Sequence, residues 1–507
     1  MIVVAEKLFK PHIKPQISLI LDELAFLLAS LGIRGYLTGG FLRDVILMRE
    51  TADIDIALEA DALKIAPKIA EGFSGKVVTL DDENGIARII LPDKLHHIDL
   101  VSASSGITDD LKRRDFTVNA MAVGLSELNQ GLKKGAAIPF IDPFCGTDDL
   151  KKKLIRVVDN GAFEKDPLRL LRAVRLGAEL SFAITPDTEL LVKDSAHLLD
   201  KVAGERLREE LIKILAIPHS EQLPVYMEEL GLVTALFPDL AKARGIEQPK
   251  EHTWDVLYHS LNTVAAVDFV LRQGNWRYAD EAVLYNIPWS EELECYFNQK
   301  ISGSSTRRVL TKLAAILHDI AKPVTKARNL DGRIRFIGHP KEGEPMAAAA
   351  LKKLRFSTRE IKMVSAMVRN HLRPVQMSQG SEMPSERAIY RYFRDSEDAG
   401  IETLYLSLGD HLATRGPELD PRDWQQHIML VDYILRQKEK QKQRVASPKL
   451  LDGHDLMNIF NLKPGPEIKE LLEAIREAQA SGEITTSDEA LAYIISLLKA
   501  RTDRVND

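Results

Sequence analysis

Apolar residues with helical spacing occur near the start of the chain, and shorter alternating runs follow them. The helical face comprises Ile17, Ile20, Leu21, Leu24 and Leu28. The stretch 36–58, YLTGGFLRDVILMRETADIDIAL, predicts a strand, a two-glycine turn, a helix and a second strand. A helix at about 61–72 and strands at 77–80, 87–92 and 96–103 follow. The pattern predicts a small head built from a mixed sheet and helices.

The pattern becomes helical after the head, so the predicted fold class is α+β with all-α domains following the head. A chain of 507 residues is too long for one core. We expect a head at 1–158, a helical neck at 159–245, a helical domain at 246–445 and a tail of three short helices at 446–507. Residues 272–308 are polar and aromatic, which indicates an insertion in the third domain. The run 436–444, RQKEKQKQR, is expected to end a helix and predicts a solvated linker or, less simply, an RNA contact.

Composition and charge narrow the class of protein. No apolar run approaches the roughly 18 residues that span a bilayer, and the first residues lack a signal-peptide pattern. Cys145 and Cys295 are too few for a disulfide framework. We therefore expect a cytoplasmic protein without a membrane partner. The net charge of −6 argues against a globally basic nucleic-acid binder but permits a local basic groove.

The two-glycine turn and the following strand carry the first candidate chemistry. Gly39 and Gly40 let backbone approach a phosphate closely. Asp53 and Asp55 are two residues apart in a strand, so their side chains point to one face and can hold Mg²⁺. The alternative is a glycine turn followed by a polar strand end. Asp99, on a later strand, is either a third metal carboxylate or a strand-end residue paired with a loop.

The segment 109–123, DDLKRRDFTVNAMAV, adds a pair of arginines and two polar residues. The guanidinium groups of Arg113 and Arg114 match phosphate geometry. Asp115 and Asn119 are spaced for one helix face, where they can hold a sugar hydroxyl or orient the arginines. A solvated helix N-terminus is the alternative.

A basic stripe follows in the segment 163–180, FEKDPLRLLRAVRLGAEL. Arg169, Arg172 and Arg175 recur at every third position, and Asp166 before Pro167 predicts a helix N-cap. Cytosine and adenine each present an amino donor beside a ring-nitrogen acceptor, which Asp166 and Arg169 can match together. The pair can therefore select C and A without a template. The alternative is a capping Asp166 and arginines paired with acidic neighbours.

Six motifs of the sequence resemble, in the same order, those of the class II tRNA nucleotidyltransferases (CCA-adding enzymes) and the related bacterial poly(A) polymerases. They are TGGFLRD, DIDIA, DDLKRRDFTVNAMA, the IDPF…G turn, DPLRLLRAVR and GERLREELIKIL. The resemblance implies a polymerase-β-like head with a five-stranded sheet. It also implies nucleotide contacts at Gly40, Arg43 and Arg114, metal ligands at Asp53 and Asp55, and base recognition at Asp166 and Arg169. Arg172 and Arg175 would lie beside them.

Three departures bear on the substrate. Lys165 stands where the family often has an acidic residue, which bears on base selectivity. About fifteen residues separate Asp99 from Asp115, and relatives that add only CC resemble this short form. The segment LPDKLHHIDLV lacks the basic, phenylalanine-containing signature of the poly(A) polymerase branch, which favours tRNA.

A second candidate site begins after residue 251 and is rich in histidine and aspartate. The ordered set His259, His318-Asp319 and Asp410 resembles the HD superfamily of metal-dependent phosphohydrolases, with His339 and His371 as candidate second-metal ligands. The alternative for each residue is a hydrogen-bonded core histidine. The resemblance implies a divalent transition metal such as Mn, Ni or Zn, and cyclic or terminal phosphates of tRNA as substrates.

Together these patterns predict an enzyme that adds C and A, as CCA, CC or A, to tRNA 3′ ends from CTP and ATP with Mg²⁺. The three-helix tail resembles the C-terminal domain of these relatives and would bind the tRNA. The alternatives are a poly(A) polymerase, or an RNA-binding phosphohydrolase whose transferase head is inactive.

Overall fold

The computed structural model describes residues 4–5, 13–134, 138–279, 281–378, 382–445 and 450–506. The chain forms two compact units, one comprising residues 1–202 with 230–232, and the other comprising 203–229 with 233–507. The predicted start of the tail, at 446, lies outside the described residues. Among the described residues, no helix combines the length and apolar character needed to cross a bilayer. The two cysteines are free.

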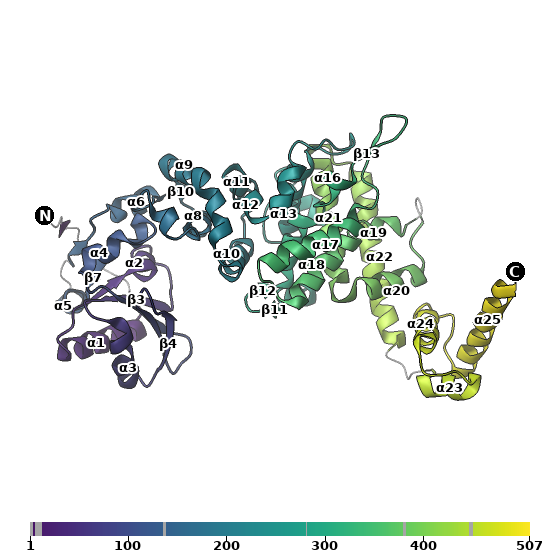
Figure 1. Cartoon of the computed structure of the whole chain (residues 1–507), viewed down its shortest axis with the longest axis horizontal. Coiled ribbons are helices and arrows are strands. Elements are labelled where there is room, and N and C mark those ends of the chain that lie inside the picture. Colours follow the sequence, from purple (N-terminus) through teal and green to yellow (C-terminus); the bar gives the residue numbers. More distant parts are fainter. Residues whose placement is uncertain are drawn as a thin grey trace. The chain divides into compact units, whose positions relative to one another are not determined.

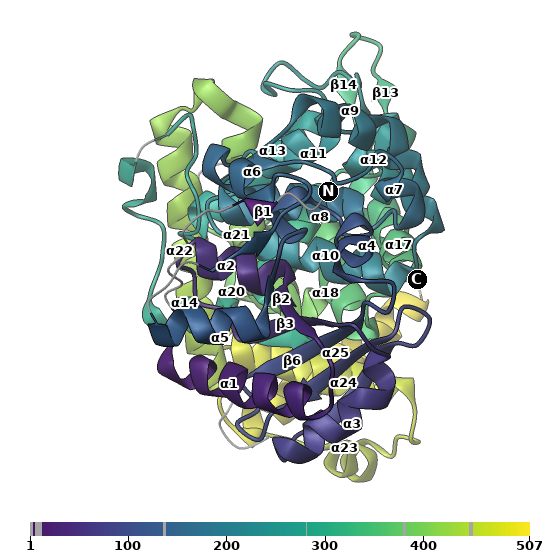
Figure 2. The same cartoon turned by 90° about the vertical axis from the view of Figure 1, so that its left-hand side faces the viewer.

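The first unit is built on a mixed sheet, which confirms the predicted head. The strand order is β1-β8-β7-β2-β3-β6-β5-β4. The strands are β1 Val4–Ala5, β2 Gly35–Thr38, β3 Asp53–Leu58, β4 Lys76–Asp81, β5 Ile86–Ile90, β6 His97–Ser102, β7 Ala122–Gly124 and β8 Phe140–Ile141. The expectation of five strands is therefore wrong, because the short strands β1, β8 and β7 extend one edge beyond β2. The central strands β2, β3 and β6 lie side by side (Figure 2).

Helices of the first unit cover the sheet and supply its core. They include α1 Pro15–Ser30, α2 Gly39–Ile46, α3 Ala62–Gly72, α4 Ile107–Lys112 and α5 Leu125–Lys134. Four of the five predicted α1 core residues are buried, and Ile20 is half-buried. Asp61 caps α3 by accepting from the N–H of Leu63 and Lys64, which fixes the predicted start of this helix.

The rest of the first unit is helical. It includes α6 Gly146–Lys152, α7 Ala162–Lys165, α8 Arg169–Leu180 and α9 Pro186–Ser195. The helix predicted to start at Asp166 and Pro167 begins slightly later, as α8 at Arg169, and the short helix α7 ends just before Asp166. Asp166 still accepts from the N–H of Leu168, at 3.3 Å, as a residue before a helix does.

The second unit is mainly helical (Figure 1), and one of its almost completely buried helices packs against several others. This helix, α13 Val256–Val270, is buried on nearly every face and packs against α15 Arg307–Leu317 and α21 Gly400–Arg415. Helices α17 His339–Lys353 and α18 Thr358–Asn370 pack on each other beside α15. The neighbouring elements include α10 Gly204–Ala216, α14 Glu291–Phe297, α16 Lys322–Thr325, α20 Glu386–Asp395 and a hairpin of β13 Ala327–Arg328 with β14 Ile334–Arg335.

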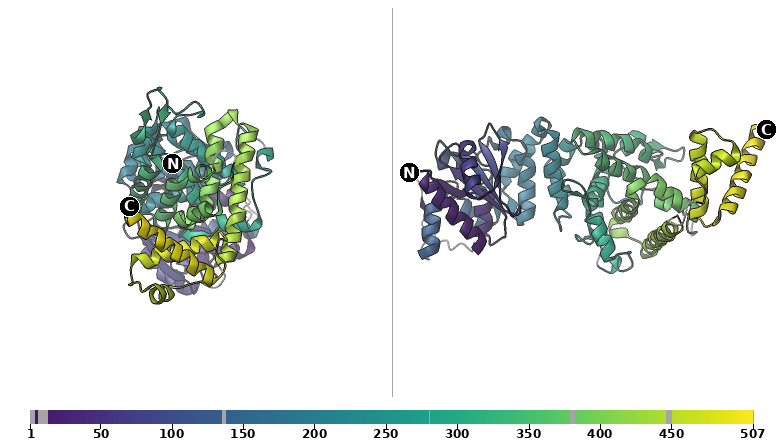
Figure 3. Two further views of the ribbon diagram at one scale, coloured as in Figure 1. Left: turned by 90° about the vertical axis from the view of Figure 1, so that its right-hand side faces the viewer. Right: turned by 90° about the horizontal axis from the view of Figure 1, so that it is seen from below.

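The tail consists of three helices, drawn in yellow in Figure 3, as predicted. They are α23 Gly453–Phe460, α24 Pro466–Ala480 and α25 Ser487–Asn506. The run 436–444 ends a helix, α22 Pro421–Val445, as predicted, but it is not solvated throughout. Gln437 and Gln441 are buried there, and Arg444 donates to the carbonyl of Ala480 at 3.0 Å.

Candidate functional sites

The first candidate site lies where β3 and β6 run in parallel. Asp53 and Asp55 lie two positions apart on β3, and Asp55 pairs in register with Asp99 of β6. The side chain of Asp53 is exposed, whereas that of Asp55 is largely buried and accepts from the N–H of Phe41 at 3.1 Å. Three carboxylates therefore gather at one end of two adjacent strands.

Burial raises the pKa of Asp55, and the charges of Asp99 and Asp53 add to this effect. The N–H of Phe41 and the charge of Arg114 oppose it. Crowded carboxylates with a raised pKa favour a bound cation, because the cation offsets both the desolvation and the mutual repulsion. The arrangement fits a divalent ion held by Asp53 and Asp55.

Asp99 has a partner that the sequence did not indicate. Arg88 of β5 lies opposite it in register, and Nε and Nη2 each donate to one oxygen of Asp99, both at 2.7 Å. Asp99 thus lies beside the other two carboxylates, and it pairs with Arg88 on a neighbouring strand, not with a loop. Its role as a third metal carboxylate stays a prediction.

The two glycines begin α2 directly beside these carboxylates. Gly39 has a φ of +66°, and a Cβ atom there would lie 2.6 Å from Asp55 Oδ2 and 2.9 Å from Arg114 Nη1. At Gly40 the nearest atoms would be 3.5 Å away. The close approach at Gly39 therefore places backbone, carboxylate and guanidinium within one small space.

Asp115 and Asn119 form part of a buried chain of hydrogen bonds. Asn119 donates to Asp115 Oδ1 at 3.0 Å and accepts from Arg43 Nη1 at 2.8 Å. Arg172 of α8 donates to Asp115 Oδ2 from Nε at 2.9 Å. The shared helix face predicted for these residues is wrong, because Asp115 lies in a bend, Phe116 is extended, and Asn119 ends a short 3₁₀ helix, Thr117–Asn119. The two side chains nevertheless contact each other.

The chain of hydrogen bonds that links Arg43 to Arg172 affects the charge state of Asp115. Burial disfavours its ionised form, but the charge of Arg172 and the donors Asn119 and the Phe116 N–H hold its pKa well below the usual range. Asp115 is therefore ionised at neutral pH, and it ties α8 to the helix that follows the two glycines.

The other members of the basic stripe also have protein partners. Arg169 donates from Nη2 to the carbonyl of Arg113 at 2.6 Å and from Nη1 to that of Arg114 at 3.3 Å. Arg175 pairs with Glu179 at 2.8 Å. Arg114 donates from Nη2 to Thr38 Oγ1 at 2.7 Å. The stripe thus holds the 113–115 segment in place beside the glycines, and its role in base recognition stays a prediction.

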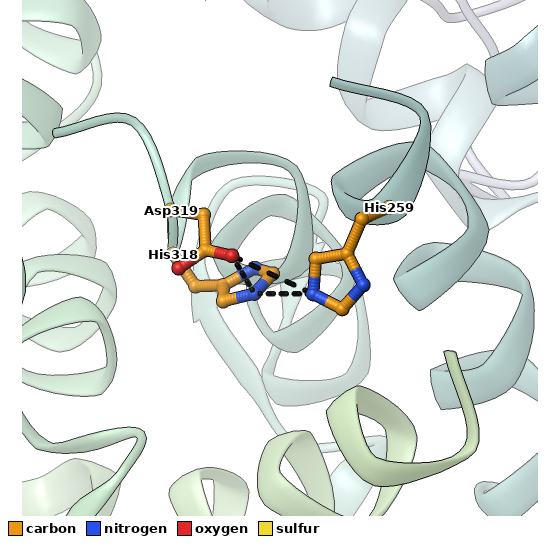
Figure 4. Close-up of side chains that lie close together, drawn as sticks. All are labelled: His259, His318 and Asp319. Atoms are coloured by element: carbon orange, nitrogen blue, oxygen red, sulfur yellow. Dashed lines mark hydrogen bonds and ion pairs between the residues drawn. The ribbon is translucent and has the colours of Figure 1, made fainter. Parts of the chain in front are cut away.

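The second candidate site lies in the second unit and gathers all six residues predicted from the sequence. Asp319 lies between two pairs of histidines. Its Oδ2 is 3.2 Å from His318 Nε2 and 3.5 Å from His259 Nε2 (Figure 4). Its Oδ1 is 3.2 Å from His339 Nε2 and 3.8 Å from His371 Nε2. One carboxylate therefore joins two clusters of imidazole nitrogens.

The first of these clusters has a second carboxylate. Asp410 Oδ1 lies 3.0 Å from His259 Nε2 and 3.7 Å from His318 Nε2. Three overlapping groups among the described residues have ligand atoms close enough for one metal ion each: His259 with His318 and Asp319, His318 with His371 and Asp410, and Asp319 with His339 and His371. The four histidines and Asp319 are buried.

The histidines are oriented by backbone carbonyls. His318 Nδ1 lies 2.8 Å from the carbonyl of Ala315, His339 Nδ1 lies 2.7 Å from that of Phe336, and His371 Nδ1 lies 2.7 Å from that of Val368. A carbonyl only accepts, so each Nδ1 carries a proton, and Nε2, which faces Asp319, is the nitrogen left to bind a metal ion. Outer hydrogen bonds of this kind orient histidine ligands of metal ions. The donor set therefore fits two divalent metal ions joined by Asp319.

A cavity of about 460 Å³ opens on this centre. Its lining includes Asp319, His339, His371 and Asp410, together with Lys322 and His252. Lys322 Nζ lies 2.6 Å from Asp319 Oδ2. Neither Lys322 nor His252 was predicted as a site residue from the sequence, although Lys322 follows the His-Asp pair by one helical turn.

Sequence profiles of known domains match most of the chain. The poly A polymerase head domain matches residues 35–156, and the probable RNA and SrmB-binding site of polymerase A matches 181–244. The HD domain matches 289–415, and domain 2 of the tRNA nucleotidyltransferases matches 424–495.

Curated proteins match over nearly the full length. An A-adding tRNA nucleotidyltransferase of Deinococcus radiodurans is 30% identical over 90% of this chain and 94% of that protein. A CC-adding tRNA nucleotidyltransferase of Thermus thermophilus is 29% identical over 90% and 92%. A solved Thermotoga maritima CCA-adding enzyme complexed with tRNA has the same fold, with a TM-score of 0.59 and 23% identity over 97% of this chain and all of that one.

The fold and the first site thus define a nucleotidyltransferase head of the poly A polymerase type, joined in one chain to an HD domain. The chain belongs to the family of class II tRNA nucleotidyltransferases, in the branch that carries an HD domain. The resemblance noted in the sequence is therefore confirmed. Nucleotidyltransferase and HD domains generally use divalent metal ions, and both sites have the carboxylate or histidine ligands for them.

Proposed function

We propose that this protein adds C and A, as CCA or as its CC or A part, to the 3′ ends of tRNA, using CTP, ATP and Mg²⁺. The observation that carries the proposal is the placement of Asp53 and Asp55 on one face of β3 beside the backbone of Gly39. Relatives named for A addition, CC addition and CCA addition support the substrate class.

In the proposed reaction the tRNA 3′ oxygen bonds to the α-phosphorus of the nucleotide. The bond from that phosphorus to the β-phosphate bridging oxygen breaks, pyrophosphate leaves, and the hydroxyl proton passes to water. Asp53 and Asp55 would hold Mg²⁺, which supplies charge neutralisation and activation of the attacking hydroxyl. Asp99, held by Arg88, would complete the acidic cluster.

The remaining residues position the nucleotide. Gly39 and Gly40 leave room for the triphosphate, and Arg114 lies beside them to contact it. Arg43 is fixed by Asn119, so its guanidinium faces one direction before the substrate arrives. Asp166 and Arg169 would match the shared edge of cytosine and adenine, with Arg172 and Arg175 beside them.

The test supplies tRNA that ends before CCA, or after CC, with CTP and ATP separately and together, and sequences the product ends. We expect C, CC or CCA on the first tRNA, or A on the second, and loss of all incorporation in Asp53→Asn. Long A tails on a generic RNA with ATP alone would instead indicate a poly(A) polymerase. Full activity of Asp53→Asn would overturn the transferase assignment.

We infer a second activity, metal-dependent hydrolysis of phosphate esters, at the HD centre. It rests on the two imidazole clusters joined by Asp319. The six ligands would hold two transition-metal ions such as Mn, Ni or Zn, which supply an activated water and neutralise the phosphate. A water oxygen bonds to phosphorus, the ester P–O bond breaks, and the leaving alcohol takes a proton. Hydrolysis of p-nitrophenyl phosphate by the wild type, lost in Asp319→Ala, tests this activity.

A further inference from the structure

The sheet of the first unit has one covered face and one open face. Helix α3 packs against β4, β5 and β6, and the alternate residues Ile89 of β5 and Ile98 of β6 are completely buried. Side chains alternate along a strand, so their neighbours Arg88 and Asp99 lie on the opposite face. These two residues are partly exposed. The open face is therefore the one that carries the acidic cluster of the first candidate site.

A row of in-register residues crosses this open face from Asp53 to the edge of the sheet. Asp53 pairs with His97 of β6, and His97 pairs with Ile90 of β5. Ile90 pairs with Lys76 at the start of β4, which is the edge strand. Lys76 is exposed, and His97 Nδ1 lies 3.3 Å from Asp53 Oδ1. The row thus leads from a carboxylate to a cation three strand spacings away, roughly 14 Å.

A second row beside it contains a cation held in a fixed orientation. Asp55 pairs with Asp99, and Asp99 pairs with Arg88. Arg88 uses Nε and Nη2 to donate to the two oxygens of Asp99. A guanidinium has five N–H donors, so three remain for a ligand, and 32% of this side chain is exposed. The row ends at Val78 of β4, an exposed apolar residue.

The two substrates of the proposed reaction need different sides of the carboxylates. The two glycines begin α2 directly after β2, and β2 lies on one side of β3 in the sheet. Strands β6, β5 and β4 lie on the other side of β3. A triphosphate beside the glycines therefore leaves this second side for the RNA. An RNA end close to three carboxylates is repelled unless cations offset its phosphates, and Arg88 and Lys76 supply them.

We propose that the open face of β6, β5 and β4 binds the single-stranded 3′ end of the acceptor RNA. Arg88 and Lys76 contact its phosphates, and the His97 ring lies beside the terminal nucleotide, where it offers a flat surface to a base. Ile90 and Val78 contact sugars and bases between the two cations. The inference rests on the proposed transferase function and names the path of its second substrate. Phosphate contacts carry no base information, so the path accepts any sequence.

The first test measures RNA binding to the full chain without metal or nucleotide, and so does not depend on turnover. It compares a tRNA that ends after CC with the same tRNA trimmed to its last base pair. Lys76→Ala should weaken binding of the first about two- to fivefold, as for one exposed charge contact, and leave the trimmed tRNA unaffected. The slope of log K against log[salt] should become shallower by about 0.7, the value for one phosphate of a single strand.

Further variants separate a phosphate contact from a general effect of charge. Lys76→Arg should keep the wild-type affinity, whereas Arg88→Lys should weaken binding of the CC-ended tRNA alone, because the fork to Asp99 is lost. Lys68→Ala is the matched control, since Lys68 is exposed on α3, which packs on the covered face. Equal losses in Lys76→Ala and Lys68→Ala, or an equal effect of Lys76→Ala on both tRNAs, would overturn the inference.

The second test locates the RNA end directly. A tRNA with 4-thiouridine as its last nucleotide should crosslink to the segment 76–99 on irradiation, and crosslinks confined to other segments contradict the proposed path. Incorporation of nucleotides with crosslinks only elsewhere overturns the path and leaves the transferase standing. Crosslinks within 76–99 without incorporation of CTP or ATP overturn the transferase assignment and leave the RNA path standing.

Discussion

Arg172 and Asp115 form an ion pair in which both Nε and Nη2 of the arginine donate to one carboxylate oxygen, at 2.9 and 2.5 Å. Asp115 is buried, and its other oxygen accepts from Asn119 and from the N–H of Phe116. Since Asn119 also holds Arg43, the pair joins the basic helix α8 to the helix that begins with the two glycines. The proposed base-binding and triphosphate-binding residues are thus connected by protein contacts.

Arg172→Met should destabilise the first unit by about 2–3 kcal/mol at pH 7, because it leaves a buried carboxylate without its charged partner. In the wild type the pKa of Asp115 lies below its unfolded value of about 3.9, so this stabilisation is present above that pH and is lost as the pH falls. In the variant, burial raises this pKa, so stability is lost as the pH rises instead. The destabilisation should therefore be larger at pH 7 than at pH 4.

Hydrogen exchange of the 113–124 segment at both pH values measures this effect. Arg175→Met is the control, since Arg175 pairs with the half-buried Glu179 on its own helix and not with Asp115. Equal protection in Arg172→Met and wild type at pH 7 would show that the ion pair contributes no stability.

Asp166→Ala should reduce selectivity for C and A more than it reduces total incorporation. Asp166 is proposed to accept from the amino group that cytosine and adenine share, and removal of one good base contact costs about 1–3 kcal/mol of discrimination. We expect UTP misincorporation to rise roughly tenfold or more. Sequencing of product ends with mixed nucleotides measures it, and selectivity equal to the wild type would remove Asp166 from base recognition.

The local chemistry of both sites could be predicted from the sequence because it follows short-range rules. Alternation along a strand places Asp53 and Asp55 on one face, and the histidines of the second site stand in recognisable motifs. The features that could not be predicted from the sequence depend on contacts between distant segments. Arg88 pairs with Asp99 through the β5–β6 register, which the apolar pattern of either strand does not specify.

The prediction of helical structure around Asp115 was wrong for a related reason. The i, i+4 spacing of Asp115 and Asn119 suits a helix, but a bridge between Phe116 and Val157 and the ion pair to Arg172 hold this segment extended. Tertiary contacts therefore override local spacing here. Helix α8 begins later than predicted because the chain remains extended at Asp166.

Gly39→Ala should lower nucleotide incorporation by about a hundredfold or more. The added methyl group would lie 2.6 Å from Asp55 Oδ2, so the carboxylate must move, and displacements of about 1 Å at a catalytic centre cost that much. Gly32→Ala is the matched control. Gly32 has nearly the same φ, +68°, but no atom lies within 4 Å of its Cβ position.

Both alanine variants bear a similar backbone strain of about 1–2 kcal/mol, and the close contacts at Gly39 add to it, so the melting temperature should fall at least as much in Gly39→Ala as in Gly32→Ala. Only Gly39→Ala should lose incorporation. If the two variants lose activity equally, strain explains the effect and the close approach at Gly39 has no catalytic importance.

The HD centre should bind two metal ions, and substitutions should remove them selectively. His339→Ala breaks only the cluster at Asp319 Oδ1, and His259→Ala breaks only the cluster at Oδ2. Each should leave one ion, whereas Asp319→Ala should leave none. Elemental analysis after dialysis against Mn²⁺ measures the stoichiometry, and two ions retained in Asp319→Ala would refute the joining role of this carboxylate.

Removal of metal from the HD centre should destabilise the second unit, and the chain carries a reporter for this unit. All four tryptophans, at 254, 276, 289 and 424, lie in this unit, so tryptophan fluorescence follows its unfolding without a signal from the first. An ion present at a hundred times its dissociation constant stabilises the folded state by about 2.7 kcal/mol. A chelator should therefore lower the unfolding temperature seen by fluorescence. Asp319→Ala should unfold at the same temperature with and without metal, and a metal-dependent shift in that variant would place the stabilising ion elsewhere.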